Sequence, residues 1–296
     1  MKDFKSQDTW MVFKIMGEFV EGFETLRRLG PAVSIFGGAR FSKDAPEYAL
    51  AREIAGRIAR AGYGIITGGG PGCMEAANQG AVLAGARSVG LGIKLPFEQG
   101  MNEFATMKLE FDYFFARKVM FIRYAQAYIC LPGGYGTLDE VFEALTLIQT
   151  AKIRNFPVIL VGRKFWKGLL DWIDSTLIRL GTISPEDQKI YTVVDTADEV
   201  LEVILKSRDR ARRNARHSRT ERTAIETREI ETREDTGPRE RSPNGDEKLQ
   251  TAADVQKVVD KAVGRAVTKA VQSVKLAPGA GTLANVRRPR QRRRRA

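Results

Sequence analysis

The sequence predicts a doubly wound α/β domain, with helices on both faces of one parallel sheet, followed by a disordered basic C-terminal tail. Short apolar segments alternate with amphipathic ones from residue 31 to residue 206, which is typical of a parallel sheet with helical crossovers. Three glycine-rich turns each connect a predicted strand to a predicted helix. Large apolar residues become few after about residue 206, so we expect the folded domain to end there.

The chain begins with a predicted N-terminal helix within residues 1–30. Its apolar residues recur at helical spacing, and they are Met11, Ile15, Phe19, Phe23 and Leu26. Such a helix would pack on the domain or on a partner subunit.

Residues 31–206 are predicted from their apolar runs and from the glycines and prolines between them. Strands are expected over 32–36, 63–66, 88–93, 127–131, 157–161 and 191–194. Helices are expected over 46–60, 73–84, 117–124, 138–150, 166–180 and 197–206. A loop is expected between the third strand and the helix that begins at residue 117. This order describes a single Rossmann-like domain, in which ligands bind beyond the carboxyl ends of the strands.

The tail, residues 207–296, is expected to be mostly disordered, and the C-terminal part of the chain carries the net basic charge. Residues 1–205 contain 23 Lys and Arg and 24 Asp and Glu, whereas residues 206–296 contain 25 and 12. A valine stripe over 254–274 is compatible with a weak oligomerising or docking helix. The polybasic end, residues 287–295, could contact a nucleic acid or another anionic surface weakly. A solvated tail without a partner is the alternative.

The scarcity of histidine and cysteine excludes several kinds of site. Cys73 and Cys130 are the two cysteines, without CxxC spacing, and the one histidine, His217, lies in the tail. We therefore expect no metal site, no organic cofactor and no mechanism that needs a histidine base. Two cysteines give no disulfide framework, which fits a reducing cytoplasm, and no apolar run is long enough for a membrane span.

The most informative segment is residues 131–140, with the sequence LPGGYGTLDE. It connects a predicted strand to a predicted helix, so its backbone N–H groups would face a ligand at the positive end of the helix, which favours a phosphate. Asp139 and Glu140 are expected in the first turn of that helix. A phosphate cradle with an acid beside it indicates chemistry on a nucleotide.

The other two turns are FGGAR at residues 36–40 and TGGGPGCME at residues 67–75. A single turn of this kind could serve only close helix–strand packing, but three at one sheet edge favour a ligand site. The NAD fingerprint fits badly, because Glu75 stands where a third glycine or alanine is needed and the following strand ends in Lys94 instead of an acid. A Walker A motif is absent. A nucleoside monophosphate remains as the ligand.

Together with YFFARKVM at residues 113–120, the segments GGGPGCME and PGGYGTLDE resemble the Lonely Guy family. These proteins are cytokinin riboside 5′-monophosphate phosphoribohydrolases, once called lysine decarboxylases, and the resemblance covers residues 30–205. It implies hydrolysis of the N-glycosidic bond of AMP or a cytokinin riboside 5′-monophosphate to free base and ribose 5-phosphate. It also implies a homodimer or larger assembly, with the helix over 11–26 or 138–150 at an interface. Action on other purine or pyrimidine monophosphates, and a non-catalytic nucleotide sensor or carrier, are the alternatives.

The resemblance assigns the catalytic roles to Arg117 and Glu140. Glu140 would stabilise the positive charge that develops on the ribose and orient or deprotonate the attacking water; its alternative is helix N-terminal capping, since acids favour the first turn. Arg117 would keep Glu140 ionised and bind ribose or phosphate; its alternative is a surface ion pair.

Eleven further residues are expected to bind the substrate. They are Gly37, Gly38, Gly69, Gly70, Met74, Glu98, Lys118, Gly133, Gly134, Gly136 and Thr137. Met74 could instead be ordinary helix packing, and Glu98 a solvated loop acid. Gly38 departs from the family pattern, because many members have serine there.

Overall fold

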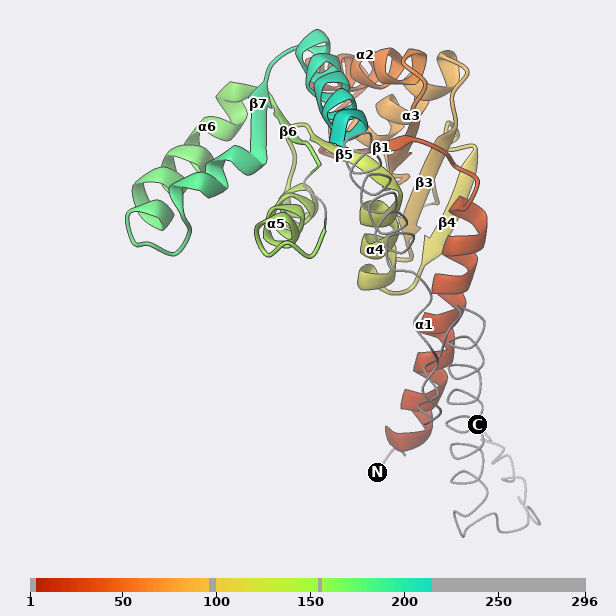
Figure 1. The fold of residues 1–296 in the computed structure, drawn as a ribbon. Coiled ribbons are helices and arrows are strands. Elements are labelled where there is room, and N and C mark those ends of the chain that lie inside the picture. Colours follow the sequence, from red (N-terminus) through yellow and green to blue (C-terminus); the bar gives the residue numbers. More distant parts are fainter. Residues whose placement is uncertain (1–3, 96–99, 154–155, 215–296) are drawn as a thin grey trace, which may run out of the picture. The chain divides into compact units, whose positions relative to one another are not determined.

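A computed structural model describes residues 4–95, 100–153 and 156–214, with side chains from residue 10 onward. Seven parallel strands form one sheet (Figure 1). The strands are β1 (Ala32–Phe36), β2 (Gly64–Thr67), β3 (Ser88–Ile93), β4 (Met107–Phe111), β5 (Ala125–Cys130), β6 (Val158–Val161) and β7 (Tyr191–Val194). Their spatial order is β4-β3-β2-β1-β5-β6-β7.

This order places a topological switch point between β1 and β5. The chain builds the sheet outward from β1 through β2 and β3 to β4, and then returns to pair β5 with the other side of β1. The turns that leave β1 and β5 therefore diverge at their carboxyl ends, and such a crevice is where doubly wound sheets bind ligands.

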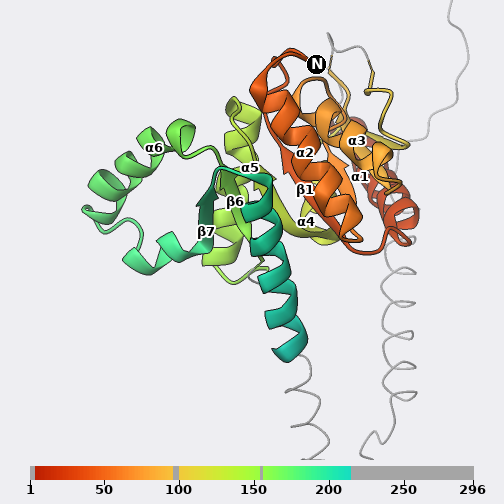
Figure 2. The same ribbon diagram turned by 90° about the horizontal axis from the view of Figure 1, so that it is seen from above.

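Helices cover both faces of the sheet, as predicted (Figures 1 and 2). They are α1 (Phe4–Leu26), α2 (Pro46–Arg60), α3 (Cys73–Leu83), α4 (Phe114–Tyr124), α5 (Tyr135–Gln149), α6 (Arg163–Trp172) and a last helix over 197–214. One core cluster joins α2, α3 and the last helix to the sheet. The second joins α1, α4, α5 and α6 to the opposite face. Each strand of the centre is buried on both sides, which explains its continuous apolar sequence.

The structure corrects the prediction of a loop over residues 94–116, because β4 adds an edge strand there that pairs with β3. Leu109 and Phe111 are buried while Lys108 and Glu110 are exposed. This alternation is typical of a strand with one solvent-facing side. Because charged residues alternate with apolar ones here, the segment contains no continuous apolar run, and a strand was not predicted.

Several helix boundaries also differ from the prediction. The helix α4 begins at Phe114 instead of Arg117, and α5 begins at Tyr135 instead of Leu138. The predicted helix over 166–180 is α6 followed by a turn of π-helix, η1 (Ile173–Ile178), and a 3₁₀ helix, η2 (Pro185–Ile190), precedes β7. The last helix continues from residue 206 to residue 214. The rest of the predicted tail, including the segments 254–274 and 287–295, lies outside the described residues.

The helix α1 packs on α4 along one side only. Leu26 is fully buried, and a Cβ placed on Gly22 would lie 2.7 Å from the Met120 Cε atom, so a larger residue there would require the Met120 side chain to move. On another side, Phe13 and Val20 are about 60% exposed. The sequence predicted packing on the domain or on a partner subunit; packing on the domain is confirmed, and packing on a partner stays a prediction.

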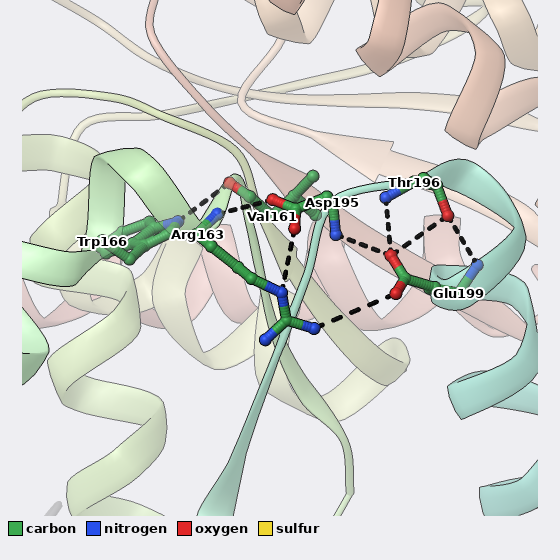
Figure 3. Close-up of polar contacts among 6 residues, drawn as sticks. All are labelled: Val161, Arg163, Trp166, Asp195, Thr196 and Glu199. Carbon is green, nitrogen blue, oxygen red and sulfur yellow. Dashed lines mark hydrogen bonds and ion pairs between the residues drawn. The ribbon is translucent and has the colours of Figure 1, made fainter.

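A polar cluster fixes the position of α6 at the carboxyl ends of β6 and β7 (Figure 3). The Arg163 guanidinium pairs with the Asp195 carboxylate at 2.9 Å, and the Arg163 N–H donates to the same carboxylate. Thr196 and Glu199 form reciprocal hydrogen bonds at the start of the last helix, as in a capping box. The Trp166 indole N–H donates to the Val161 carbonyl at 3.0 Å. None of the helices described is long and apolar enough to cross a membrane.

Candidate active site

A cleft of about 750 Å³ opens at the switch point, over the carboxyl ends of β1, β2 and β5. Its walls come from the three glycine turns, the first turns of α3 and α5, and one side of α4. Ten of the predicted site residues line it: Gly37, Gly38, Gly70, Met74, Arg117, Gly133, Gly134, Gly136, Thr137 and Glu140. The parallel sheet therefore brings together residues that lie about a hundred positions apart in the chain.

Backbone contacts join the three glycine turns. The Gly38 N–H donates to the Pro132 carbonyl at 2.9 Å, and the Gly38 carbonyl accepts from the Cys73 N–H at 3.1 Å. Gly72 has a φ of +66°, and a Cβ there would lie 2.4 Å from the Gly38 oxygen. A Cβ on Gly133 would lie 2.2 Å from the Thr137 hydroxyl. Gly72 is required because its turn touches the first turn through the backbone, and Gly133 because the Thr137 side chain and the Gly38 nitrogen lie close to it.

The N-terminus of α5 has the form of a phosphate cradle. Gly134 occupies the N-cap position without a capping side chain, and the amides of Tyr135 and Gly136 lie in the first turn, where a helix offers no carbonyl to them. Among the described residues, a Cβ on Gly134 or Gly136 would meet no atom within 4 Å beyond its chain neighbours and the backbone of its own helix. Protein packing therefore does not require these two glycines, whereas the close approach of a ligand to the backbone would.

Glu140 is buried at the cleft beside this cradle. Its side chain is 2% exposed, and its Oε2 atom has no hydrogen-bond partner among the described residues. Burial raises the pKa of this carboxyl to about 7, while the opposite charges of Lys118 and Arg117 lower it. The helix starts at Tyr135, so Asp139 and Glu140 lie in its second turn and the prediction of first-turn acids is wrong. Helix capping therefore does not account for Glu140.

The two neighbouring cations on α4 take different positions. The Arg117 guanidinium carbon lies 5.4 Å from the ring centre of Phe114 and 5.5 Å from that of Phe121, on the wall of the cleft. Lys118 does not line the cleft, although we predicted that it binds substrate. Its ammonium pairs with the carboxylates of Asp139 at 2.8 Å and Glu143 at 3.1 Å. Burial lowers the pKa of Lys118, but these acids raise it to above its ordinary value.

One more predicted residue, Gly69, does not line the cleft. Gly69 lines a separate hollow of about 140 Å³ next to it. Glu98 falls within residues 96–99, outside the described residues. Met74 both lines the cleft and packs on the second turn, because a Cβ on Gly70 would lie 2.7 Å from its Cε atom. The two predictions for Met74, a residue of the nucleotide site and ordinary helix packing, are therefore compatible with its position.

A buried polar network positions the second glycine turn. The Asn102 side-chain amide donates to the carbonyls of Gly69 and Gly70 and to the Asn78 side-chain oxygen, each at 3.0 Å. Asn78 in turn accepts from the Thr67 hydroxyl at 2.6 Å. Sequence reasoning missed Asn78 and Asn102, because neither belongs to a glycine motif.

Sequence reasoning also missed several residues of the cleft wall. The aromatic ones are Phe41, Phe114, Phe121, Tyr135 and Phe165, and Arg40 is an additional cation. Arg40, Phe114, Phe121 and Tyr135 lie within or beside the recognised motifs, so their place in the chain was an available signal. Phe165 lies on α6, and no local pattern places it at the cleft.

Comparison with known proteins shows the family of this chain. A family model described as "Possible lysine decarboxylase" matches residues 74–204. The cytokinin riboside 5′-monophosphate phosphoribohydrolase of Mycobacterium tuberculosis is 30% identical over 159 residues, which cover 51% of this chain and 82% of that protein. A protein of the same name from Arabidopsis thaliana is 28% identical over 173 residues, covering 57% and 79%.

Among solved structures, the molybdenum cofactor binding protein of Rippkaea orientalis is 24% identical, with a TM-score of 0.44 over 60% of this chain and 96% of that one. The sequence relationship to the Mycobacterium tuberculosis protein extends over most of that protein's length. The family model and this sequence relationship show that the chain belongs to the Lonely Guy family, the group of the cytokinin riboside 5′-monophosphate phosphoribohydrolases.

Proposed function

We propose that this protein hydrolyses the N-glycosidic bond of a nucleoside 5′-monophosphate, with AMP or a cytokinin riboside 5′-monophosphate as substrate, and releases free base and ribose 5-phosphate. The observation that carries the proposal is Glu140, a buried carboxyl with an unpartnered Oε2 atom on the wall of the cleft. A buried carboxylate oxygen without a hydrogen-bond partner is costly to the fold, so a role toward a ligand is the better explanation. The relatives' names support the reaction.

The spacing along α5 suits a nucleoside monophosphate. The 5′-phosphate would accept hydrogen bonds from the backbone at Tyr135 and Gly136 and from the Thr137 hydroxyl. Glu140 follows about one helical turn later, about 5 Å along the axis. A ribose that extends from the phosphate along the helix would bring its C1′ atom close to the Glu140 carboxylate.

The reaction then needs only groups of this chain and one water. As the bond from C1′ to the base nitrogen breaks, its electron pair leaves with the base and positive charge develops on the ribose. The Glu140 carboxylate stabilises that charge and accepts a proton from the water that attacks C1′. The departing base takes up a proton, which restores the carboxylate. Arg117 would bind the sugar and help keep Glu140 ionised, because its charge lowers the Glu140 pKa.

A substrate panel tests this proposal. Purified protein is incubated with purine and pyrimidine nucleoside monophosphates and with the matching nucleosides, and free base is measured by chromatography. We expect base release from monophosphates, its loss in Glu140→Gln, and its retention in the control Asp139→Asn, whose carboxyl is about half exposed and lies outside the cleft. Tight binding of monophosphates without any base release would instead identify a nucleotide sensor or carrier.

A homodimer or larger assembly is part of the proposal. The outward side of α1 carries Phe13, Met16 and Val20, each more than half exposed, and monomers rarely leave a contiguous apolar surface uncovered. Phe142 on α5 is also exposed. Light scattering should give a mass of at least two chains, and charged residues at Phe13 and Val20 should reduce it if α1 forms the interface.

The proposed anionic contact of the tail concerns residues outside the described part of the chain. Retention on DNA that decreases with salt, and is lost on truncation after residue 214, would support it. Equal retention of the truncated and complete proteins would show that the tail does not bind DNA.

A further inference from the structure

A second cation, Arg40, lines the cleft from the loop between β1 and α2. Within the described part of the chain, no carboxylate lies within 4.0 Å of its guanidinium. The cleft wall thus contains two guanidinium groups, Arg40 and Arg117, and one carboxyl, Glu140. This balance leaves positive charge available for an anionic ligand.

The loop that carries Arg40 is held on both sides of that residue. Before it, Gly38 hydrogen-bonds to Pro132 at 2.9 Å. After it, the Lys43 ammonium pairs with the Glu75 carboxylate at 2.9 Å, and Phe41 packs against the core. These contacts hold the backbone on both sides of Arg40, and its exposed side chain lines the cleft from there.

The same contacts place this loop against the phosphate cradle. A Cβ on Gly133 would lie 3.0 Å from the Gly38 nitrogen, so the two turns touch directly. Arg40 follows Gly38 by two residues, whereas Arg117 comes from α4 and lies between the rings of Phe114 and Phe121. The two cations therefore approach the cleft from different walls.

We propose that Arg40 binds the 5′-phosphate of the substrate and thereby makes the site selective for nucleoside monophosphates over nucleosides. This inference rests on the proposed function and adds the side chain that recognises the phosphate. A guanidinium can donate two parallel hydrogen bonds to phosphate oxygens. The backbone amides of α5 and the Arg40 side chain would then bind the phosphate from two sides, and Arg117 would be left to the ribose and to Glu140.

Binding of ribose 5-phosphate tests the inference without requiring turnover. The complete chain is titrated calorimetrically with ribose 5-phosphate and, separately, with ribose. In Arg40→Ala we expect the affinity for ribose 5-phosphate to fall about 10- to 100-fold, the loss of one charge-assisted contact, with ribose binding unchanged. Arg40→Lys should recover part of the affinity. The control Arg52→Ala, at an exposed position on α2 outside the cleft, should bind like wild type.

Kinetics provide the second readout. Arg40→Ala should raise KM for the monophosphate far more than it lowers kcat, and leave kcat/KM for the matching nucleoside unchanged. Unchanged affinity for ribose 5-phosphate, or an equal loss for ribose, would overturn the role of Arg40. If Arg40→Ala loses ribose 5-phosphate binding while wild type releases no base from any nucleotide, Arg40 remains a phosphate ligand and the proposed hydrolysis fails.

Discussion

Glu140→Gln should stabilise the protein while it abolishes turnover. In the folded state, burial raises the pKa of Glu140 from 4.5 to about 7, whereas the unfolded chain keeps the ordinary value. Above pH 7 the carboxyl is ionised in both states, and the folded state carries the full cost of burying the charge. Below pH 4.5 it is protonated in both states and this cost is absent. The stability contribution of Glu140 therefore falls as the pH rises from 4.5 to 7.

The magnitude follows from the size of the shift. A pKa difference of this size corresponds to about 3 kcal/mol at pH 8 and to less than about 1 kcal/mol at pH 5. A glutamine amide at this position reduces the gain in stability by about 1 kcal/mol, because the buried polar group in the place of Oε2 would also have no hydrogen-bond partner. We expect Glu140→Gln to be more stable than wild type by about 2 kcal/mol at pH 8, a rise in Tm of about 4–8 °C for a domain of this size, and to show no gain at pH 5.

Thermal and urea unfolding at the two pH values measure this directly, with Asp139→Asn as the control. That control loses an ion pair to Lys118 and should gain no stability at either pH. If Glu140→Gln were equally or less stable than wild type at pH 8, Glu140 would be a structural acid with satisfied hydrogen bonds. The inference that its buried charge destabilises the fold would then be wrong.

Four further substitutions test other parts of the site. Lys118→Met should raise the Glu140 pKa, because the Lys118 charge lowers it, so the acid limb of the kcat/KM profile should move to higher pH; an unchanged profile would exclude this coupling. Gly134→Ala meets no protein atom within 4 Å and should keep the wild-type Tm while it weakens nucleotide binding about tenfold or more. Gly133→Ala, which clashes with the fold, should lower Tm. Asn102→Ala removes the side-chain donor to the Gly70 carbonyl and to the Asn78 side-chain oxygen, so it should lower the free energy of unfolding in urea by about 2 kcal/mol, whereas no change would show that the network is dispensable.

Strands and glycine turns could be predicted because their signals are local. The bounds of β1 and α2 match the prediction, since Pro46 starts the helix and an unbroken apolar run marks the strand. Because parallel strands end at one edge of the sheet, the turns at Gly38 and Gly133 could be predicted to lie together without any knowledge of loop conformation.

The remaining site depends on three-dimensional relations that the sequence does not express locally. Arg117 and Lys118 are neighbours in the same motif, yet consecutive residues on a helix point about 100° apart, so only one of them lines the cleft. Phe165 lies at the cleft because contacts of Arg163 with Asp195 fix the start of α6. The homo-oligomer, the role of the tail and a cytoplasmic location stay predictions.

Hydrolysis by means of Glu140 is tested most directly by a product analysis of AMP incubated with wild type and with Glu140→Gln. We expect equal amounts of adenine and ribose 5-phosphate from wild type. We expect neither product from Glu140→Gln, which should still bind AMP within a few-fold of wild type. Undiminished adenine release by Glu140→Gln would contradict the assignment of Glu140 as the catalytic carboxylate. Bound but intact AMP in both proteins would contradict hydrolysis itself.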